Sequence, residues 1–248
     1  MRPATLQSRF NVLDDMSSDD VQALLAGATG VSGREPPILK GRHVVILCEE
    51  ALSEAADGLA DAALALGATV VRLHPRTLRL EEPLRLRETA LLLGRLYHLI
   101  ACEGLGLPAN TGLCRWSGVP VLCDLAAASH PTRVLADLLV MQEHAGRPAA
   151  EITLGLLDDP DSEAFRSWQL ASALTGLRLV RLEPPAHTPL AASGPACDYC
   201  FQAAPSGGTG STLRVASTAA GGGGEDLARR QHDAHRRLLQ SVLVNATG

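Results

Sequence analysis

Short apolar runs alternate with longer amphipathic segments along most of the 248-residue chain. Runs such as residues 43–48, in which nearly every residue is apolar, are typical of strands buried on both faces of a parallel sheet. Segments such as 51–66 carry Ala and Leu at helical spacing and end at glycine, which favours a helix. The pattern predicts strands at 43–48, 69–73, 97–102, 119–123, 152–157, 177–182 and 213–217. It predicts helices at 51–66, 83–96, 131–144, 162–175 and 225–245.

Strands and helices therefore alternate, and this order predicts an α/β fold with two doubly wound parallel-sheet domains and right-handed crossovers. We expect the first α/β unit to span residues 1–146, with part of the final helix at 225–245 packing back on it. We expect the second, reduced unit to span 147–224. It includes a Gly/Pro/Ser-rich segment and ends in four glycines at 221–224, which are typical of a flexible hinge.

Composition and charge exclude several classes of function. The net charge of −5 and the aromatic content of 3% argue against a nucleic-acid partner. We expect no membrane span, because no apolar run reaches the length of about 18 residues that a span requires. The first residues do not resemble a secretion signal, so the sequence favours a cytoplasmic protein. Lys40 is the only lysine and no Gly-Lys-Ser/Thr triplet occurs, so we expect neither a nucleotide phosphate loop nor pyridoxal phosphate, and no cofactor.

The chain has six cysteines. Cys197 and Cys200 have the CxxC spacing of a zinc half-site or a redox pair. A second CxxC is missing, so the sequence favours free thiols that pack as small apolar groups, and no metal site.

Several ordered blocks of the chain resemble one family, the aspartate and ornithine carbamoyltransferases. The blocks are residues 10–25, 39–47, 62–73, 82–90 and 119–144. The strongest match is the stretch Val119 to Leu139 followed by Glu143-His144, and the Arg-Gln-His-Asp-Ala-His run at 230–235 is similar to the family's last helix. The resemblance covers about residues 10–183 and the final helix. It implies the carbamoyltransferase type of fold, with a second domain that is truncated here.

The family transfers a carbamoyl group from carbamoyl phosphate to an amino group, and its members hold the phosphate with a Ser-Thr-Arg-Thr-Arg stretch at a helix N-terminus. That stretch falls on Leu52, Ser53, Glu54, Ala55 and Ala56, so one hydroxyl is kept and both arginines are lost. Each lost charge-assisted hydrogen bond costs about 1.5–3 kcal/mol. A carboxylate near the phosphate adds up to about 4 kcal/mol of repulsion. The resemblance therefore implies an affinity for carbamoyl phosphate that is several thousand-fold weaker, which Arg42 or Arg79 would recover only in part.

The part of the family's site that binds the carbonyl group is partly kept. Its Ile-Arg-Thr falls on Ala101-Cys102-Glu103, so an arginine is lost at Cys102. Its His-Pro-Thr-Gln is present as His130-Pro131-Thr132-Arg133, and the resemblance gives His130 the role of donating to a carbonyl oxygen. The alternative is that His130 and Pro131 only begin a helix.

The amino-acid part of the family's site is reduced. Its Gly-Asp-Gly-Asn-Asn turn falls near residues 158–162, where Asp159 or Asp161 is a candidate for holding an ammonium group. The alternative is an ordinary Asp-rich turn after a strand. No His-Cys-Leu-Pro stretch occurs.

Three functions are compatible with these residues. The favoured one is a catalytically impaired or inactive family member that acts as a structural, regulatory or partner subunit. The second is an active transferase that moves a carbamoyl group to ornithine, aspartate or a related amino acid. The third is an amino-acid-binding module. The resemblance also implies a homo- or hetero-oligomer, a trimer in the family, and either an amino acid or carbamoyl phosphate as the small ligand.

Overall fold

The computed structural model describes residues 11, 13–30, 37–49, 54–127, 129–157, 159–182, 197–202, 212–216 and 224–247. The chain forms two compact units. The first contains residues 1–16, 23–126 and 236–248, and the second contains residues 17–22 and 127–235. Helices α1 (Ser18–Gly30) and α7 (Gly224–Thr247) each contribute residues to both units.

The sheet of the first unit has four parallel strands in the order β2-β1-β3-β4. These strands are β1 (His43–Cys48), β2 (Thr69–Leu73), β3 (Leu99–Glu103) and β4 (Val121–Cys123). All are buried or nearly so except β2, which lies at an edge and has the pattern of partly exposed positions expected there. The all-apolar runs in the sequence therefore correspond to strands covered on both faces.

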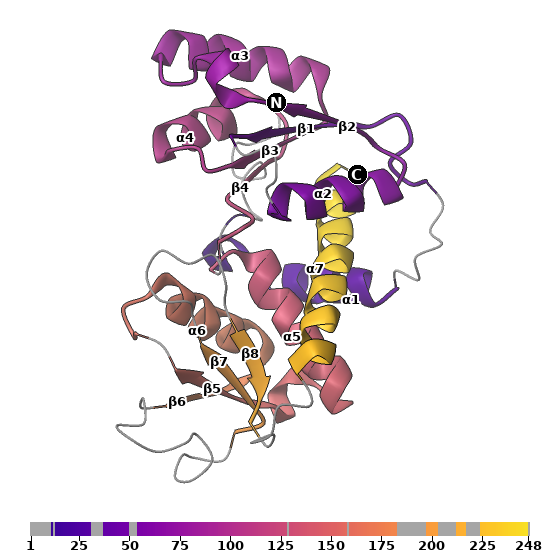
Figure 1. The fold of residues 1–248 in the computed structure, drawn as a ribbon, viewed down its shortest axis with the longest axis vertical. Coiled ribbons are helices and arrows are strands. Elements are labelled where there is room, and N and C mark those ends of the chain that lie inside the picture. Colours follow the sequence, from indigo (N-terminus) through magenta and orange to yellow (C-terminus); the bar gives the residue numbers. More distant parts are fainter. Residues whose placement is uncertain are drawn as a thin grey trace. The chain divides into compact units, whose positions relative to one another are not determined.

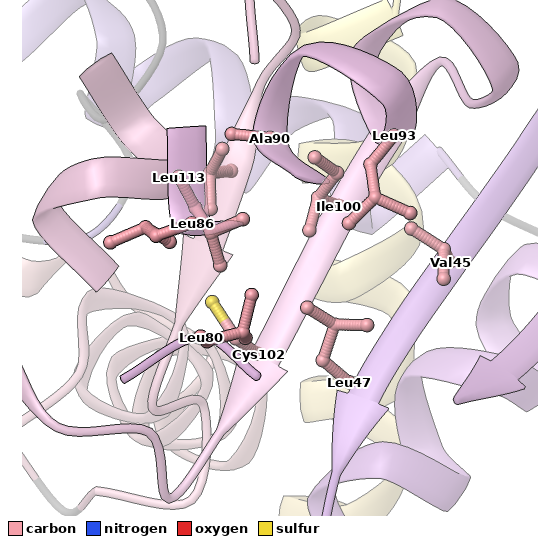
Figure 2. Packing of buried hydrophobic residues seen from close by; sticks show 10 residues of the cluster. Val45, Leu47, Leu80, Leu86, Ala90, Leu93, Ile100, Cys102 and Leu113 are labelled. Carbon is pink, nitrogen blue, oxygen red and sulfur yellow. The ribbon is translucent and has the colours of Figure 1, made fainter. Parts of the chain in front are cut away.

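One face of this sheet is covered by α3 (Pro83–Leu96) and α4 (Leu107–Trp116). Figure 2 shows Leu86 and Ala90 of α3 and Leu113 of α4 packed with Ile100 and Cys102 of β3. Helix α2 (Glu54–Ala65) is also amphipathic, with Leu59 and Ala63 fully buried. The described residues of the unit also form two short 3-10 turns, η2 (Leu13–Asp15) and η3 (Pro75–Leu78).

The end of α7 packs within the first unit through small residues. A Cβ on Gly27 of α1 would lie 2.3 Å from the Ser241 hydroxyl, and one on Gly58 of α2 would lie 3.9 Å from Leu239. The backbones of α1 and α7 therefore approach each other closely at Gly27.

The exposed leucines of the unit include several on α3, namely Leu84, Leu91, Leu92 and Leu96.

The second unit holds a mixed sheet in the order β6-β5-β7-β8. Its strands are β5 (Thr153–Leu157), β6 (Arg178–Arg181), β7 (Tyr199–Gln202) and β8 (Thr212–Val215), with helices α5 (Pro131–Ala145) and α6 (Glu163–Thr175) and the 3-10 turn η4 (Ala149–Glu151). Strands β5, β6 and β7 are parallel, but β8 pairs with β7 in the antiparallel direction. The prediction of a fully parallel second sheet is therefore wrong at its last strand. Only the nine residues 203–211 join β7 to β8, and a parallel connection needs a crossover of a dozen or more residues.

Local signals in the sequence account for the helix ends in this unit. Ser162 begins α6 by accepting a hydrogen bond from the Phe165 N–H at 3.0 Å. Gly146 and Gly176 end α5 and α6 with left-handed φ angles of 65° and 77°. The sequence places the domain boundary at residue 146, whereas in the structure α5 groups with the second unit. Its C-terminal turn bonds to β7, where the Tyr199 hydroxyl donates to the Met141 carbonyl at 3.2 Å.

Candidate functional site

Helix α5 begins with a histidine cap. His130 has an extended backbone, and its Nδ1 accepts the backbone N–H of Thr132 at 3.2 Å. Pro131 takes the first helical position, where its lack of an N–H costs nothing. We call His130, Thr132 and Arg133 the α5 start. The interpretation of His130 as a helix start is therefore confirmed, and this role leaves the other ring nitrogen available.

The hydrogen bonds at the α5 start assign the tautomer of His130. Because Nδ1 accepts the Thr132 N–H, the proton of the neutral ring lies on Nε2. The Thr132 hydroxyl lies 2.8 Å from this Nδ1 and 3.1 Å from Nε2 of His235 on α7. The donor and acceptor roles that agree with this tautomer are that His235 donates to the Thr132 oxygen and that the Thr132 hydroxyl donates to His130. The chain of bonds ends in the Nε2–H of His130.

That Nε2–H is buried and has no hydrogen-bond partner among the described residues. His130 is 3% exposed. Burial, with a smaller contribution from the Arg133 charge, lowers the pKa of His130 to about 3. The pKa of His235 is also lowered to about 3, by burial, by Arg133 and by His130 and His232. Both rings are neutral near pH 7, so His130 offers a hydrogen-bond donor and not a cation.

A carboxylate and an amide lie close to the α5 start. Asp137, one turn after Arg133 on α5, accepts a hydrogen bond from the Gln231 side chain at 2.7 Å. Burial raises the pKa of Asp137 to about 6, although the Gln231 bond and the Arg133 charge act in the opposite direction. The Nε of Arg133 is buried and has no partner among the described residues. Sequence reasoning missed Asp137, Gln231 and His235, although the last two lie in the 230–235 run that resembles the family's last helix.

The start of α2 has a different chemistry. We use the name α2 start for Glu54, Ala55 and Ala56; Ser53 lies outside the described residues. Glu54 is exposed, whereas Ala55 and Ala56 are 3% and 0% exposed and belong to the apolar core. No Lys or Arg occurs between residues 43 and 71, and Glu49 and Glu50 precede the helix. The α2 start therefore combines a helix N-terminus, which attracts anions, with the exposed carboxylate of Glu54, which repels them.

The arginines nearest in sequence have carboxylate partners or lie at the other end of the strand. Arg72 pairs with Asp57 at 2.6 Å, Arg76 with Glu49 at 3.8 Å, and Arg79 with Glu82. Arg42 precedes the six-residue strand β1, so it lies about 20 Å from the strand's C-terminal end. Arg42 therefore lies at the far end of β1, and Arg79 already has a carboxylate partner.

The C-terminal ends of β3 and β4 are occupied by carboxylates that bind backbone amides. Cys102 is fully buried in the apolar core, with its sulfur 3.3 Å from that of Cys123, so it does not contribute a polar group. Glu103 is 7% exposed and accepts the Leu125 N–H at 2.8 Å and the Ala126 N–H at 3.4 Å. Asp124, with a left-handed φ of 55°, accepts from Gly104 N–H at 3.2 Å. Sequence reasoning did not identify the role of Glu103.

The Asp-rich turn before α6 folds on itself. Asp159 and Asp161 are both exposed, and the Asp159 side chain accepts the Asp161 N–H at 3.0 Å. This is an Asx turn, in which the carboxylate replaces a backbone acceptor. The arrangement agrees with the interpretation as a loop, and the role of either residue in holding an ammonium group stays a prediction.

Neither a metal cluster nor a membrane helix is found in the part of the chain that the structure describes. Within those residues no three His, Cys, Asp or Glu side chains are placed to hold a metal ion. No described helix is both long enough and apolar enough to cross a membrane.

Comparisons with known proteins give the family. The model of the aspartate/ornithine carbamoyltransferase carbamoyl-P binding domain matches residues 9–143, more than half of the chain. The chain is similar in fold to the ornithine carbamoyltransferase of Thermus thermophilus, at 24% identity and a TM-score of 0.61 over 75% of this chain and 63% of that one. It is also similar in fold to the ornithine carbamoyltransferase of Burkholderia thailandensis, at 20% identity and a TM-score of 0.59, over 71% of this chain and 62% of that one.

The ornithine carbamoyltransferase of Gloeobacter violaceus matches over 96% of this chain and 97% of its own, at 17% identity and a TM-score of 0.64. The chain spans less than two thirds of the Thermus and Burkholderia enzymes. These structures show that the two α/β units have the carbamoyltransferase fold. The chain belongs to the aspartate/ornithine carbamoyltransferase family.

Proposed function

We propose that this chain is a catalytically inactive or impaired carbamoyltransferase-family protein that acts as a structural, regulatory or partner subunit. The observation that carries the proposal is the α2 start. There Glu54 and two buried alanines occupy the positions that the resemblance gives to the phosphate-binding stretch.

Charge arithmetic supports the loss of activity. Two missing arginine contacts cost about 3–6 kcal/mol of phosphate affinity. Glu54 adds repulsion, although its exposure to water keeps this below the upper bound of about 4 kcal/mol. A total near 5 kcal/mol corresponds to roughly a several thousand-fold loss of affinity. Carbamoyl phosphate would then be bound too weakly for turnover.

Exposed leucines on α3 support the role as a subunit. Leu84, Leu91, Leu92 and Leu96 are 68%, 47%, 55% and 53% exposed. Their spacing of seven, eight and twelve residues from Leu84 places them along one side of the helix. An apolar stripe of this kind is typical of a surface that another subunit covers, whether a second copy or a different chain.

The α5 start favours a second candidate, an active transferase. The Nε2–H of His130 is a buried donor without a partner among the described residues, which suits a carbonyl oxygen. In this alternative a cation that binds the phosphate would come from another chain.

Transfer activity separates the candidates. Purified protein is incubated with carbamoyl phosphate and either ornithine or aspartate, and the ureido product is measured by a colorimetric assay. The proposal predicts no product above that of the α2-start control variant Glu54→Gln and the His130→Ala variant. Product that His130→Ala abolishes would overturn the proposal and support the active transferase.

The amino-acid-binding module is tested by melting temperature. The proposal predicts no shift with any amino acid at millimolar concentration. A shift with one amino acid that Asp159→Asn or Asp161→Asn removes would instead support a binding module, since ligand at about 100 times its dissociation constant stabilises by about 2.7 kcal/mol.

A further inference from the structure

The two cysteines of the CxxC motif lie side by side in the second unit. The sulfurs of Cys197 and Cys200 are 3.6 Å apart, both residues are half-buried and both thiols are free. A disulfide bond is about 2.05 Å long, so closing the bond requires the sulfurs to approach by only about 1.5 Å. The pair is therefore reduced but close to bonding distance.

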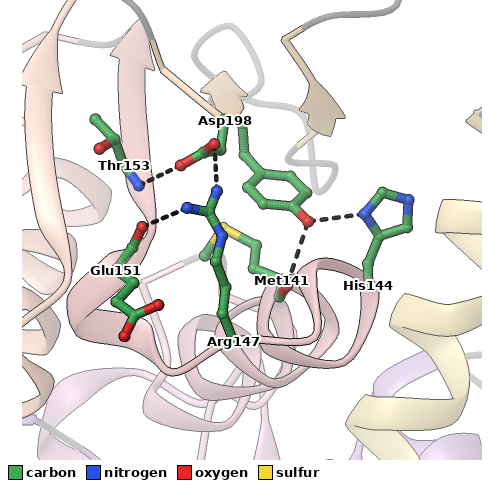
Figure 3. A network of polar contacts seen from close by, with 7 residues as sticks. Met141, His144, Arg147, Glu151, Thr153 and Asp198 are labelled. Carbon is green, nitrogen blue, oxygen red and sulfur yellow. Dashed lines mark hydrogen bonds and ion pairs between the residues drawn. The ribbon is translucent and has the colours of Figure 1, made fainter.

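The two residues between the cysteines are held by hydrogen bonds, as Figure 3 shows. The Asp198 carboxylate accepts the Thr153 N–H at 2.8 Å and pairs with Arg147. The Asp198 N–H donates to the Thr153 carbonyl at 2.8 Å. The Tyr199 hydroxyl donates to the Met141 carbonyl and lies 2.8 Å from the His144 ring. These contacts fix the backbone that carries both thiols, which lowers the entropy cost of joining them.

Gly155 on β5 makes room for one of the sulfurs. Gly155 is the register partner of Cys200 across the β5–β7 pair. A Cβ built on Gly155 would lie 3.0 Å from the Cys197 sulfur and 2.6 Å from a Leu182 methyl carbon. The Cys197 thiol therefore lies over Gly155, on the same side of the sheet as the Cys200 thiol.

The surroundings favour two-sulfur chemistry over a metal site. Structural zinc is bound by four protein ligands. Among the described residues, no third His, Cys, Asp or Glu joins these two sulfurs in a group that could hold a metal. The one carboxylate within the motif, that of Asp198, is already bonded to Thr153 and Arg147. A disulfide needs no further ligand.

We propose that Cys197 and Cys200 form a reversible dithiol–disulfide pair that small-molecule disulfides oxidise. The Cys197 thiolate attacks one sulfur of the oxidant RSSR, a mixed disulfide forms and RS⁻ leaves. Cys200 then loses its proton and attacks the Cys197 sulfur, and the second RS⁻ leaves. The protein gives up two electrons and two protons, and the oxidant becomes two RSH. Reaction with a reduced thiol reverses both steps.

Burial and the hydrogen bond with Cys197 raise the pKa of Cys200 to about 12. Cys200 therefore stays protonated near neutral pH, which favours Cys200 as the group that attacks second, since the thiolate is the nucleophile.

The first unit contains a matched control. Cys102 and Cys123 have sulfurs 3.3 Å apart, closer than the proposed pair, and are register partners on adjacent parallel strands. Cys102 is fully buried, and its hydrogen bond and burial raise the pKa of Cys123. The sulfurs are therefore similarly close in the two pairs. Cys123 is partly exposed like Cys197 and Cys200, but Cys102 is fully buried, so an oxidant reaches only one sulfur of the control pair.

The experiment uses the full chain, incubated with oxidised glutathione at neutral pH. Remaining thiols are alkylated after denaturation, and peptides are analysed by mass spectrometry without reduction. We expect a Cys197–Cys200 disulfide in roughly tenfold excess over a Cys102–Cys123 disulfide, reversed by reduced glutathione. Cys200→Ser should stop at a glutathione adduct on Cys197, and Cys197→Ser should leave Cys200 unmodified.

Three results would overturn the proposal. They are persistence of both thiols in the wild type, a stable adduct at Cys197 with Cys200 intact, and preferential oxidation of Cys102 and Cys123. Stoichiometric zinc binding that both Cys197→Ser and Cys200→Ser abolish would overturn it as well, in favour of a metal half-site. Circular dichroism of each serine variant verifies that it is folded.

Discussion

The starts of α2 and α5 differ in what their side chains do. At the α5 start, buried polar groups are joined in a chain from His235 through Thr132 to His130. At the α2 start, an exposed glutamate is followed by two buried alanines. Losing one member of the first group leaves a buried partner without a hydrogen bond, which costs about 1–3 kcal/mol. Changing the exposed Glu54 carries no such penalty, so the side chain at the α2 start can vary without loss of folding, whereas those at the α5 start cannot.

The largest effect that separates the two helix starts is expected from pH. His130 and His235 have pKa values lowered to about 3, so their stabilising effect is complete above the unfolded pKa near 6.5 and is lost as the pH falls toward 3. Asp137, with its pKa raised to about 6, acts in the opposite direction, because its effect is most favourable below about 4 and is lost as the pH rises through 6. When the contributions of the two histidines and of Asp137 are added, the free energy of unfolding is predicted to fall by about 3 kcal/mol from pH 7 to pH 4.5.

Urea unfolding at several pH values measures this dependence. Asp137→Asn removes the opposing group and keeps an oxygen that can accept the Gln231 bond, so it should make the fall steeper. His235→Gln should make it shallower. A fall in stability that neither substitution changes would show that the polar groups at the α5 start do not set the pH dependence.

A smaller effect is expected from removing one hydroxyl. Thr132→Val keeps the shape of a residue that is 1% exposed but leaves His235 without its acceptor, so it should lower the unfolding free energy by about 2 kcal/mol. Glu54→Ala, the matched change at the α2 start, should lower it by less than about 1 kcal/mol, because an exposed charge at a helix N-terminus contributes little. Equal losses in denaturant titrations would remove the distinction between the two helix starts.

The smallest effect concerns phosphate affinity. Glu54→Arg replaces a repulsive group with one charge-assisted donor, while the second missing arginine stays absent. We expect a gain of about 1.5 kcal/mol, roughly tenfold, in affinity for inorganic phosphate, measured as the shift in melting temperature at phosphate concentrations up to about 100 mM. Glu81→Arg, a charge reversal in the loop before α3, serves as the control for net charge. An equal gain in both variants would mean that the α2 start has no special relation to anions.

Most elements of the fold were predictable from the sequence, and α4 shows why one was not. Its interior includes Asn110 and Gly112, which individually disfavour a helix. The structure requires Gly112, because a Cβ there would lie 2.5 Å from Leu86 of α3. Tertiary packing therefore outweighs propensity. The antiparallel direction of β8 was not predicted either, because the alternation of apolar and polar residues in a strand is the same for parallel and antiparallel pairing.

The candidate site was predictable only where it is local in sequence. His130, Thr132 and Arg133 follow from one short motif, and the hydrogen bonds between His130 and Thr132 lie within it. The bond from Thr132 to His235 joins residues 103 positions apart, which no spacing rule reveals. The burial of Cys102, by contrast, agrees with the expectation from the sequence that this thiol packs as a small apolar group, because Cys102 ends an apolar run.

Calorimetric titration of the wild-type chain with carbamoyl phosphate tests the central claim most directly, with inorganic phosphate in a parallel titration. The loss of the phosphate-binding arginines predicts no saturable heat with either ligand at millimolar concentration. Saturable binding of carbamoyl phosphate with a dissociation constant below about 1 mM would contradict that claim. Such binding requires more than about 4 kcal/mol of binding free energy, although residues 43–71, which include the α2 start, contain no Lys or Arg.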